Sequence, residues 1–275
     1  MFFNLLRLES DKLFRRWMLW ISLALALLPG ILFQLIAFNV GRDVIPVQTF
    51  VWPNGVVNLL AFANGYYAGA GYAVYALACV IGAVTAQEYA WRTMQLWLSR
   101  GVPRSLLLIV KFLVALLCVL LVGVVFLLAG CIISLILSYQ LHGSVNIQPG
   151  DIGVVLLGTL RTTYSILPYV ALAFLLVVSM RSLVAVGGVP LFMLAIEAPL
   201  SFLLPALGLK DAAHYLPAGL AQTLTMQNYN AVHIPTQGMM ASPGDPVVSS
   251  LLVALYTLVL FALSLWIFQR QNLAN

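Results

Sequence analysis

Long apolar runs alternate with short polar segments along the whole chain, and six of these runs are long enough to cross a membrane as helices. A spanning helix needs about 20 apolar residues, because each residue advances it by about 1.5 Å. The predicted spans are residues 17–38, 66–86, 106–139, 152–180, 183–204 and 248–268. No linker or internal repeat separates them, so residues 1–275 are expected to form a single all-α integral membrane domain.

Basic side chains are concentrated in alternate connecting segments. They lie before the first span, between the second and third, between the fourth and fifth, and after the sixth: Arg7, Lys12, Arg15, Arg16, Arg92, Arg100, Arg104, Arg181 and Arg270. The opposite side has only Arg42 and Lys210, each followed by an aspartate. Since positive residues stay inside, both termini and residues 85–105 are predicted to be cytoplasmic, in a multi-pass protein of the cytoplasmic (inner) membrane.

Composition supports the membrane class. The chain is 63% hydrophobic and 8% charged, whereas a soluble domain has about 25% charged residues. The net charge of +5 therefore reflects orientation in the membrane, and no nucleic-acid partner is expected. The three cysteines all lie in apolar runs without metal-ligand spacing.

Recognisable catalytic chemistry is missing from the sequence. There is no phosphate-binding loop of the G-x-x-x-x-G-K-[ST] type, no H-E-x-x-H and no G-x-S-x-G. The three histidines are far apart and lack ligand spacing. We therefore expect no catalytic, cofactor-binding or metal-binding residue in this chain, and no enzymatic activity of its own.

The polar segment between the second and third spans has helical periodicity. One stripe of it is polar and consists of Glu88, Arg92, Gln95 and Ser99. The opposite arc is apolar and consists of Trp91, Met94, Trp97 and Leu98. Gly101 is placed to end this helix and Pro103 to open the next one. Such a helix either lies in the membrane interface or docks a cytoplasmic protein, and periodicity alone leaves both interpretations open.

Two charged residues fall within predicted spans. By helical rise, Arg161 lies about 15 Å and Glu197 about 10 Å from the outer membrane surface. In one interpretation they pair across neighbouring helices or line a translocation path. In the favoured one, Arg161 snorkels to lipid headgroups, and the prolines after Glu197 bend its helix so that the carboxylate touches water.

The region from Glu88 to Lys111 resembles the signature region of ABC-2-type transporter permeases. That family has a glutamate after span two, a Gly-Thr-Leu-like triplet, a Leu-Leu-Ser-Arg-Pro-Val-Ser-Arg-like run and a lysine entering span three. The matching positions here are Glu88, Thr93, Leu98, Ser99, Arg100, Arg104 and Lys111. The chain departs from the pattern at Arg92, where the family often has glycine, and at Pro103, which comes late. Residues 5–16 resemble the family's N-terminal helix along the membrane, and residues 214–218 its Tyr-Leu-Pro segment.

The resemblance implies the permease subunit of an ABC exporter, with an N-terminal interfacial helix and a cytoplasmic coupling helix between spans two and three. Such a subunit binds a cytoplasmic ATPase dimer, which holds the ATP and Mg²⁺, and a second permease that is identical or homologous. The implied cargo is an amphiphile such as a lipid, peptide, glycan or drug-like molecule. ATPase docking would then fall to the exposed positions Glu88, Arg92, Gln95, Ser99 and Arg100.

Other function classes make different predictions. An ion-coupled secondary transporter usually has an inverted repeat and ionisable groups at the membrane midplane, and here only Arg161 and Glu197 could serve. A non-transporting membrane anchor or sensor would bind the ATPase without moving a substrate. An intramembrane enzyme is disfavoured by the missing motifs.

Overall fold

Helices make up nearly all of the described chain, which in the computed structural model comprises residues 2–40, 46–63, 71–91, 93–182, 185, 188–233 and 244–271. An all-helical protein was predicted, and no strand occurs in these ranges. Four helical segments of the described part are long and apolar enough to cross a membrane: Trp17–Val40, Arg104–His142, Pro149–Met180 and Pro246–Arg270. These four confirm an all-α membrane protein by length and composition.

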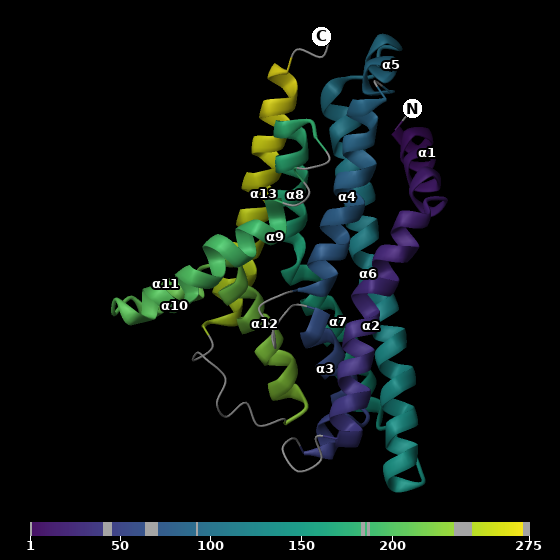
Figure 1. The fold of residues 1–275 in the computed structure, drawn as a ribbon, viewed down its shortest axis with the longest axis vertical. Coiled ribbons are helices and arrows are strands. Elements are labelled where there is room, and N and C mark those ends of the chain that lie inside the picture. The colour runs from purple at the N-terminus through teal and green to yellow at the C-terminus, as the bar shows by residue number, and fades with distance from the viewer. Residues whose placement is uncertain are drawn as a thin grey trace.

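The long helices form an elongated bundle (Figure 1). Helix α2 (Trp17–Val40) packs along α4 (Tyr72–Ala90), and α8 (Leu167–Met180) packs along α13 (Pro246–Arg270). Helix α6 (Arg104–His142) has 39 residues and contacts both pairs. In the interior of the bundle, Phe112 of α6 stacks on Phe261 of α13, with 4.1 Å between the ring centroids. Phe174 of α8 lies against the edge of Phe112. This aromatic group joins three helices that are distant in sequence.

Turn chemistry explains where several helices begin and end. Helix α6 begins after Pro103 and ends at Gly143, whose φ of 68° is the left-handed conformation that glycine adopts without strain. Helix α7 (Pro149–Ser165) begins at a proline, and Gln148 and Asp151 form a reciprocal capping box there. Helix α8 follows after a break at Ile166, so the predicted fourth span is two helices in series.

A short helix lies inside the bundle where an outer connecting segment was predicted. Helix α3 (Asn54–Ala63) follows the 3-10 turn η1 (Val47–Thr49), and all its residues from Gly55 to Ala63 are buried. Asn58 bonds to Thr49, and it accepts a hydrogen bond of 2.9 Å from Tyr229 of α12 (Pro217–Ala231). The assignment of residues 39–65 as an external segment was therefore wrong for this helix, whose apolar sequence buries it between α6 and α7.

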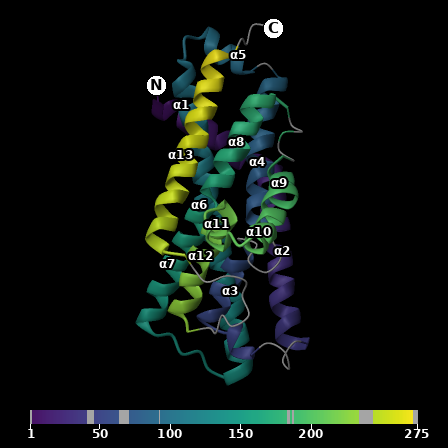
Figure 2. The ribbon, with the colours of Figure 1, turned by 90° about the vertical axis from the view of Figure 1, so that its left-hand side faces the viewer.

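The second and fifth predicted spans are not among the four long apolar helices of the described part. Helix α4 has 19 residues, but its last turn carries Gln87 and Glu88. Residues 188–206 form a broken rod of α9 (Gly188–Phe192), the π-helical segment η3 (Met193–Glu197) and α10 (Ala198–Ala206). The rod runs sideways from the bundle and returns through α11 (Lys210–His214) (Figures 1 and 2).

Both ends of the chain and the predicted coupling segment lie at the same end of the molecule. Helix α1 (Phe2–Phe14), helix α5 (Thr93–Ser99) and the last turns of α13 gather there (Figure 1). Arg104, the first residue of α6, joins that helix to the end of α13, because its guanidinium donates to the carbonyls of Gln269 and Gln271 at 3.1 and 2.8 Å. This end of the bundle carries the site described below.

Candidate functional site

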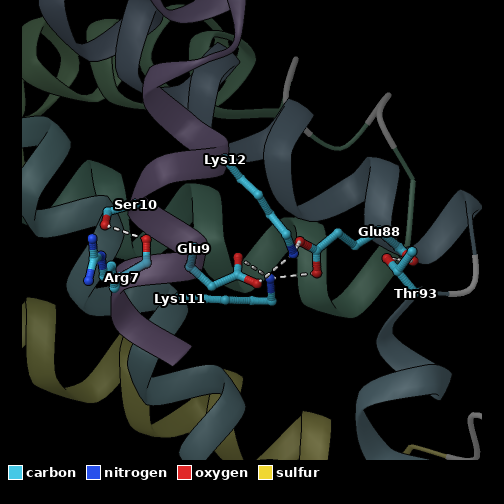
Figure 3. A network of polar contacts seen from close by, with 7 residues as sticks. All are labelled: Arg7, Glu9, Ser10, Lys12, Glu88, Thr93 and Lys111. Atoms are coloured by element: carbon cyan, nitrogen blue, oxygen red, sulfur yellow. Dashed lines mark hydrogen bonds and ion pairs between the residues drawn. The ribbon is translucent and has the colours of Figure 1, made fainter. Parts of the chain in front are cut away.

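Glu88 sits in the last turn of α4, inside the protein rather than on its surface. Only 2% of the residue is exposed. One carboxylate oxygen lies 2.5 Å from Nζ of Lys111 on α6, and the other lies 3.6 Å from Nζ of Lys12 on α1. The carboxylate therefore joins three helices (Figure 3).

Helix α1 supplies a second carboxylate to the same place. Its buried side chains are Leu5, Glu9 and Leu13, one turn apart, so Glu9 occupies the middle of an otherwise apolar stripe. Glu9 is 1% exposed and lies 3.1 Å from Lys111 and 2.9 Å from Lys12. The packing of α1 on α6 thus drives a charged residue into the interior, where it meets its counter-ions.

Glu9, Lys12, Glu88 and Lys111 form a closed group that we call the ion network (Figure 3). It contains two carboxylates and two ammonium groups, so its formal charge is zero. Burial raises the pKa of Glu9, but the charges of Lys111 and Lys12 outweigh burial and hold that pKa below its ordinary value. A buried carboxylate is tolerated here because each one has two ammonium partners.

Helix α5 stands next to the ion network. Lys12 lies over the indole ring of Trp97 in α5, at 5.5 Å from the ring centroid. Thr93, the first residue of α5, donates its hydroxyl to the Glu88 carbonyl at 3.3 Å. Because α5 contacts Lys12 of α1 and Glu88 of α4, a shift of α5 would change contacts of both helices directly. Nearby, Arg16, just before α2, donates to the side chain of Gln87 of α4 at 2.5 Å.

A small cavity opens beside the network between α1, α4 and α6. Glu9, Thr85 and Lys111 form its polar lining, and the rest is apolar, with Leu13 and Cys118 among the lining residues. No group of three or more histidine, cysteine or acidic residues in the described part of the chain has the geometry to hold a metal ion. What the arrangement offers is mechanical and electrostatic linkage between helices.

The residues predicted to dock an ATPase have different environments. Glu88 was expected on the exposed stripe, and this is wrong, because α4 continues to Ala90 and its register turns Glu88 inward. Arg92, with its expected ion pair to Glu88, lies outside the described residues. Gln95 is half-buried, Ser99 is exposed and bonds within its own turn, and Arg100 is exposed beside Trp97.

The apolar arc of the predicted helix is only partly confirmed. Met94 is 1% exposed, and Trp97 packs against the core of the bundle. Trp91, however, is 65% exposed at the break between α4 and α5. Gly101 ends α5 with a φ of 79°, as predicted. The end of α4 at Ala90, with Trp91 as its C-cap, thus converts the single helix expected over 88–100 into the end of one helix and the whole of another.

Arg161 and Glu197 are not part of this site, and they form hydrogen bonds to different residues. Arg161 donates to the side chain of Asn228 at 3.3 Å. Glu197 is 2% exposed and accepts from the hydroxyl of Tyr169 and the backbone N–H of Ala218. No ion pair joins Arg161 to Glu197 among the described residues, so the pairing hypothesis fails, and so does the expectation that Glu197 touches water.

Sequence reasoning did not find Glu9 and Lys12 as parts of the site. The signal was a carboxylate inside the apolar stripe Leu5–Leu13, which is unfavourable on a surface helix unless a cation faces it. Lys111, one turn or more inside a predicted span, was the corresponding cation. Joining the two required knowing that α1 folds back onto α6.

The fold and this site define an all-helical membrane protein of several long apolar helices, with its N-terminal helix bound by buried charges to the bundle. Residues 27–274 match the family model described as "Protein of unknown function (DUF2705)", and the chain belongs to that family. No curated protein matches the chain.

Proposed function

We propose that this chain is the permease subunit of an ATP-driven ABC exporter, and that α5 is its coupling helix. A separate cytoplasmic ATPase dimer would bind ATP and Mg²⁺, and a second permease, identical or homologous, would complete the transporter. The observation that carries the proposal is the position of α5 directly on the ion network, at the end of the molecule where both termini lie (Figures 1 and 3).

Force could pass from a partner protein to the helix bundle through α5. An external protein pushing on α5 would act on Trp97 and Thr93, which contact Lys12 and the end of α4. The ion network links these to α1 and α6 through contacts of 2.5–3.6 Å. A displacement of α5 would thus be passed to α1, α4 and α6 through side-chain contacts.

The exposed part of α5 supports a docking role. Leu96 is 59% exposed, and Ser99 and Arg100 are exposed beside it. An apolar anchor with neighbouring polar and arginine side chains is typical of protein interfaces. The proposed orientation puts α5 and both termini in the cytoplasm, as the distribution of basic residues predicts, and so requires an even number of crossings, as in the six-span prediction.

The cargo is proposed to be an amphiphile, such as a lipid, peptide, glycan or drug-like molecule, moved across or out of the cytoplasmic membrane. This part of the proposal comes from the family resemblance of residues 88–111.

The test is affinity purification of the tagged chain with its partner, followed by mass spectrometry and a transport assay in proteoliposomes. We expect an ATPase with a phosphate-binding loop to co-purify. Charge reversal in Arg92→Glu and Arg100→Glu should abolish co-purification or uncouple ATP hydrolysis from transport. Arg270→Glu, an equal charge change at the same end of the molecule but on α13, should leave both intact.

The docking assignment would be wrong if Arg92→Glu and Arg100→Glu both kept co-purification and stimulated ATPase activity. Transport driven by an ion gradient without any ATPase would instead indicate a secondary transporter. ATPase binding without flux of any substrate would indicate an anchor or sensor.

A further inference from the structure

Residues 188–216 form an arm that leaves the bundle and returns to it. It runs out through α9, η3 and α10, turns at Gly208 with a φ of 82°, and comes back through α11 (Figures 1 and 2). No residue of α10 is buried, and Phe202 and Leu207 are 60% and 72% exposed. Among the described residues, the arm is therefore anchored mainly at its root.

The outgoing root of the arm is fixed by Glu197. Its carboxylate accepts a 2.8 Å hydrogen bond from the hydroxyl of Tyr169 on α8 and a 2.5 Å bond from the backbone N–H of Ala218 in the first turn of α12. The second bond joins residues 21 positions apart and so closes the arm into a loop. At 2% exposure, this carboxylate has left water for these two donors.

The first turn of α12 needs such an acceptor. Its N-cap residue is Leu216, which has no side-chain oxygen, and no side chain of its own segment caps the helix. Glu197 provides the missing acceptor from another element, and its negative charge is favourable at a helix N-terminus. No ion pair to Glu197 occurs among the described residues, so the helix end and the tyrosine hydroxyl are its principal described partners.

The returning end of the arm is packed against the same turn. A Cβ at Gly219 would lie 2.4 Å from the carbonyl oxygen of Ala213, so only glycine permits this approach. Tyr256 of α13 donates to the Tyr215 carbonyl at 3.2 Å. Both ends of the arm therefore meet at the start of α12. The outgoing side is packed into the core through Val189 and Met193, which are 0% and 5% exposed, and beyond them it is tied to α8 and α12 by the hydrogen bonds of Glu197.

We propose that Glu197 is a latch, and that the part of the arm beyond η3, residues 198–216, swings about η3 when the latch opens. The π-helical turn Met193–Glu197 has the wider hydrogen-bond spacing that is frequent at functional sites and at kinks within helices. The latch residue is the last residue of that turn, so losing its two hydrogen bonds frees the hinge itself. This inference does not depend on the transport proposal.

The experiment measures the arm's position with two spin labels and pulsed electron resonance. The labels are placed at Leu207→Cys near the arm's tip and Leu258→Cys on α13, which are 72% and 65% exposed. The full chain is used in nanodiscs, with its three native cysteines replaced by alanine. The parent protein is expected to give one narrow distance distribution. Glu197→Ala, which removes both hydrogen bonds, and Tyr169→Phe, which removes one, should each add a second, displaced population.

Tyr164→Phe is the matched control, because it removes a tyrosine hydroxyl that bonds to the Ser250 carbonyl at 2.6 Å, between α7 and α13 and away from the arm. It should retain the parent distribution. The latch is refuted if Glu197→Ala and Tyr169→Phe both keep the single parent distribution, or if Tyr164→Phe broadens it equally. If Glu197→Ala does not fold, the comparison of Tyr169→Phe with Tyr164→Phe decides.

Discussion

Lys111 on α6 and Glu88 at the end of α4 form an ion pair of 2.5 Å in which each side chain is only 3% exposed. Two charges removed from water to this extent gain from each other only while both are present. The pair therefore fixes the end of α4 against α6, and it does so at the turn from which α5 begins. Glu9 and Lys12 extend the same constraint to α1.

Replacing Lys111 with methionine should strongly destabilise the protein. The variant keeps the volume of the side chain but leaves Glu88 and Glu9 buried without their common partner. Breaking one side of a buried pair costs about 3–5 kcal/mol. Thermal unfolding of the purified chain, followed by intrinsic tryptophan fluorescence, measures the loss.

The double variant Lys111→Met/Glu88→Gln should be more stable than Lys111→Met alone, because it removes the uncompensated charge as well. Lys12→Met serves as the control, since this ammonium is 38% exposed and lies farther from Glu88, so its loss should cost less. Simple addition of the two single effects in the double variant would mean that the pair is not coupled.

Acid should loosen the attachment of α1. The pKa of Glu9 is held below its ordinary value of 4.5, so the carboxylate favours folding fully above that value. The contribution is lost as pH falls through the lowered pKa, because protonation removes the attraction to Lys111 and Lys12. The apparent melting temperature should decrease as the pH is lowered through this pKa. In Glu9→Gln, the plot of melting temperature against pH should be flatter over the same pH range. An unchanged slope in Glu9→Gln would assign the acid sensitivity to other carboxylates.

The sequence was most informative where long apolar runs form straight helices. Spans 17–38, 106–139, 152–180 and 248–268 correspond to the four long apolar helices of the described part, because hydropathy and length determine such elements. Helix α3 was missed because its ten largely apolar residues, buried by tertiary packing, are fewer than a span needs. The sideways direction of 188–206 was also missed, since no local pattern states which way a helix points.

The exposure of Glu88 was mispredicted for a different physical reason. Periodicity placed Glu88 on the polar stripe of a continuous helix, but α4 ends at Ala90, so Glu88 follows the register of α4 and Gln95 that of α5. A helix break of this kind depends on how both helices pack. Glu9 carried a local signal, yet its partner Lys111 lies 102 residues away, a distance that pattern analysis does not bridge.

Arg104 should stabilise the last turn of α13. Its guanidinium donates to the carbonyls of Gln269 in the last turn and of Gln271 just after it, and its positive charge is favourable at a helix C-terminus. Arg104→Gln should cost about 1 kcal/mol and speed amide hydrogen exchange over the end of α13. Arg100→Gln, which changes an exposed arginine just after α5, should leave that exchange unchanged. Equal rates in Arg104→Gln and the parent would show that these bonds do not hold the helix end.

Arg161 and Glu197 should contribute to stability independently. Arg161 bonds to Asn228 on α12, whereas Glu197 bonds to Tyr169 and to the N-terminal turn of α12, and the described contacts include no shared partner atom. The destabilisation in Arg161→Ala/Glu197→Ala should therefore equal the sum of the single effects within about 0.5 kcal/mol. Direct pairing would instead make the double variant clearly less destabilised than that sum. Unfolding midpoints of the parent, both single variants and the double variant decide between these outcomes, and additivity would leave each charge with a separate structural role on α12.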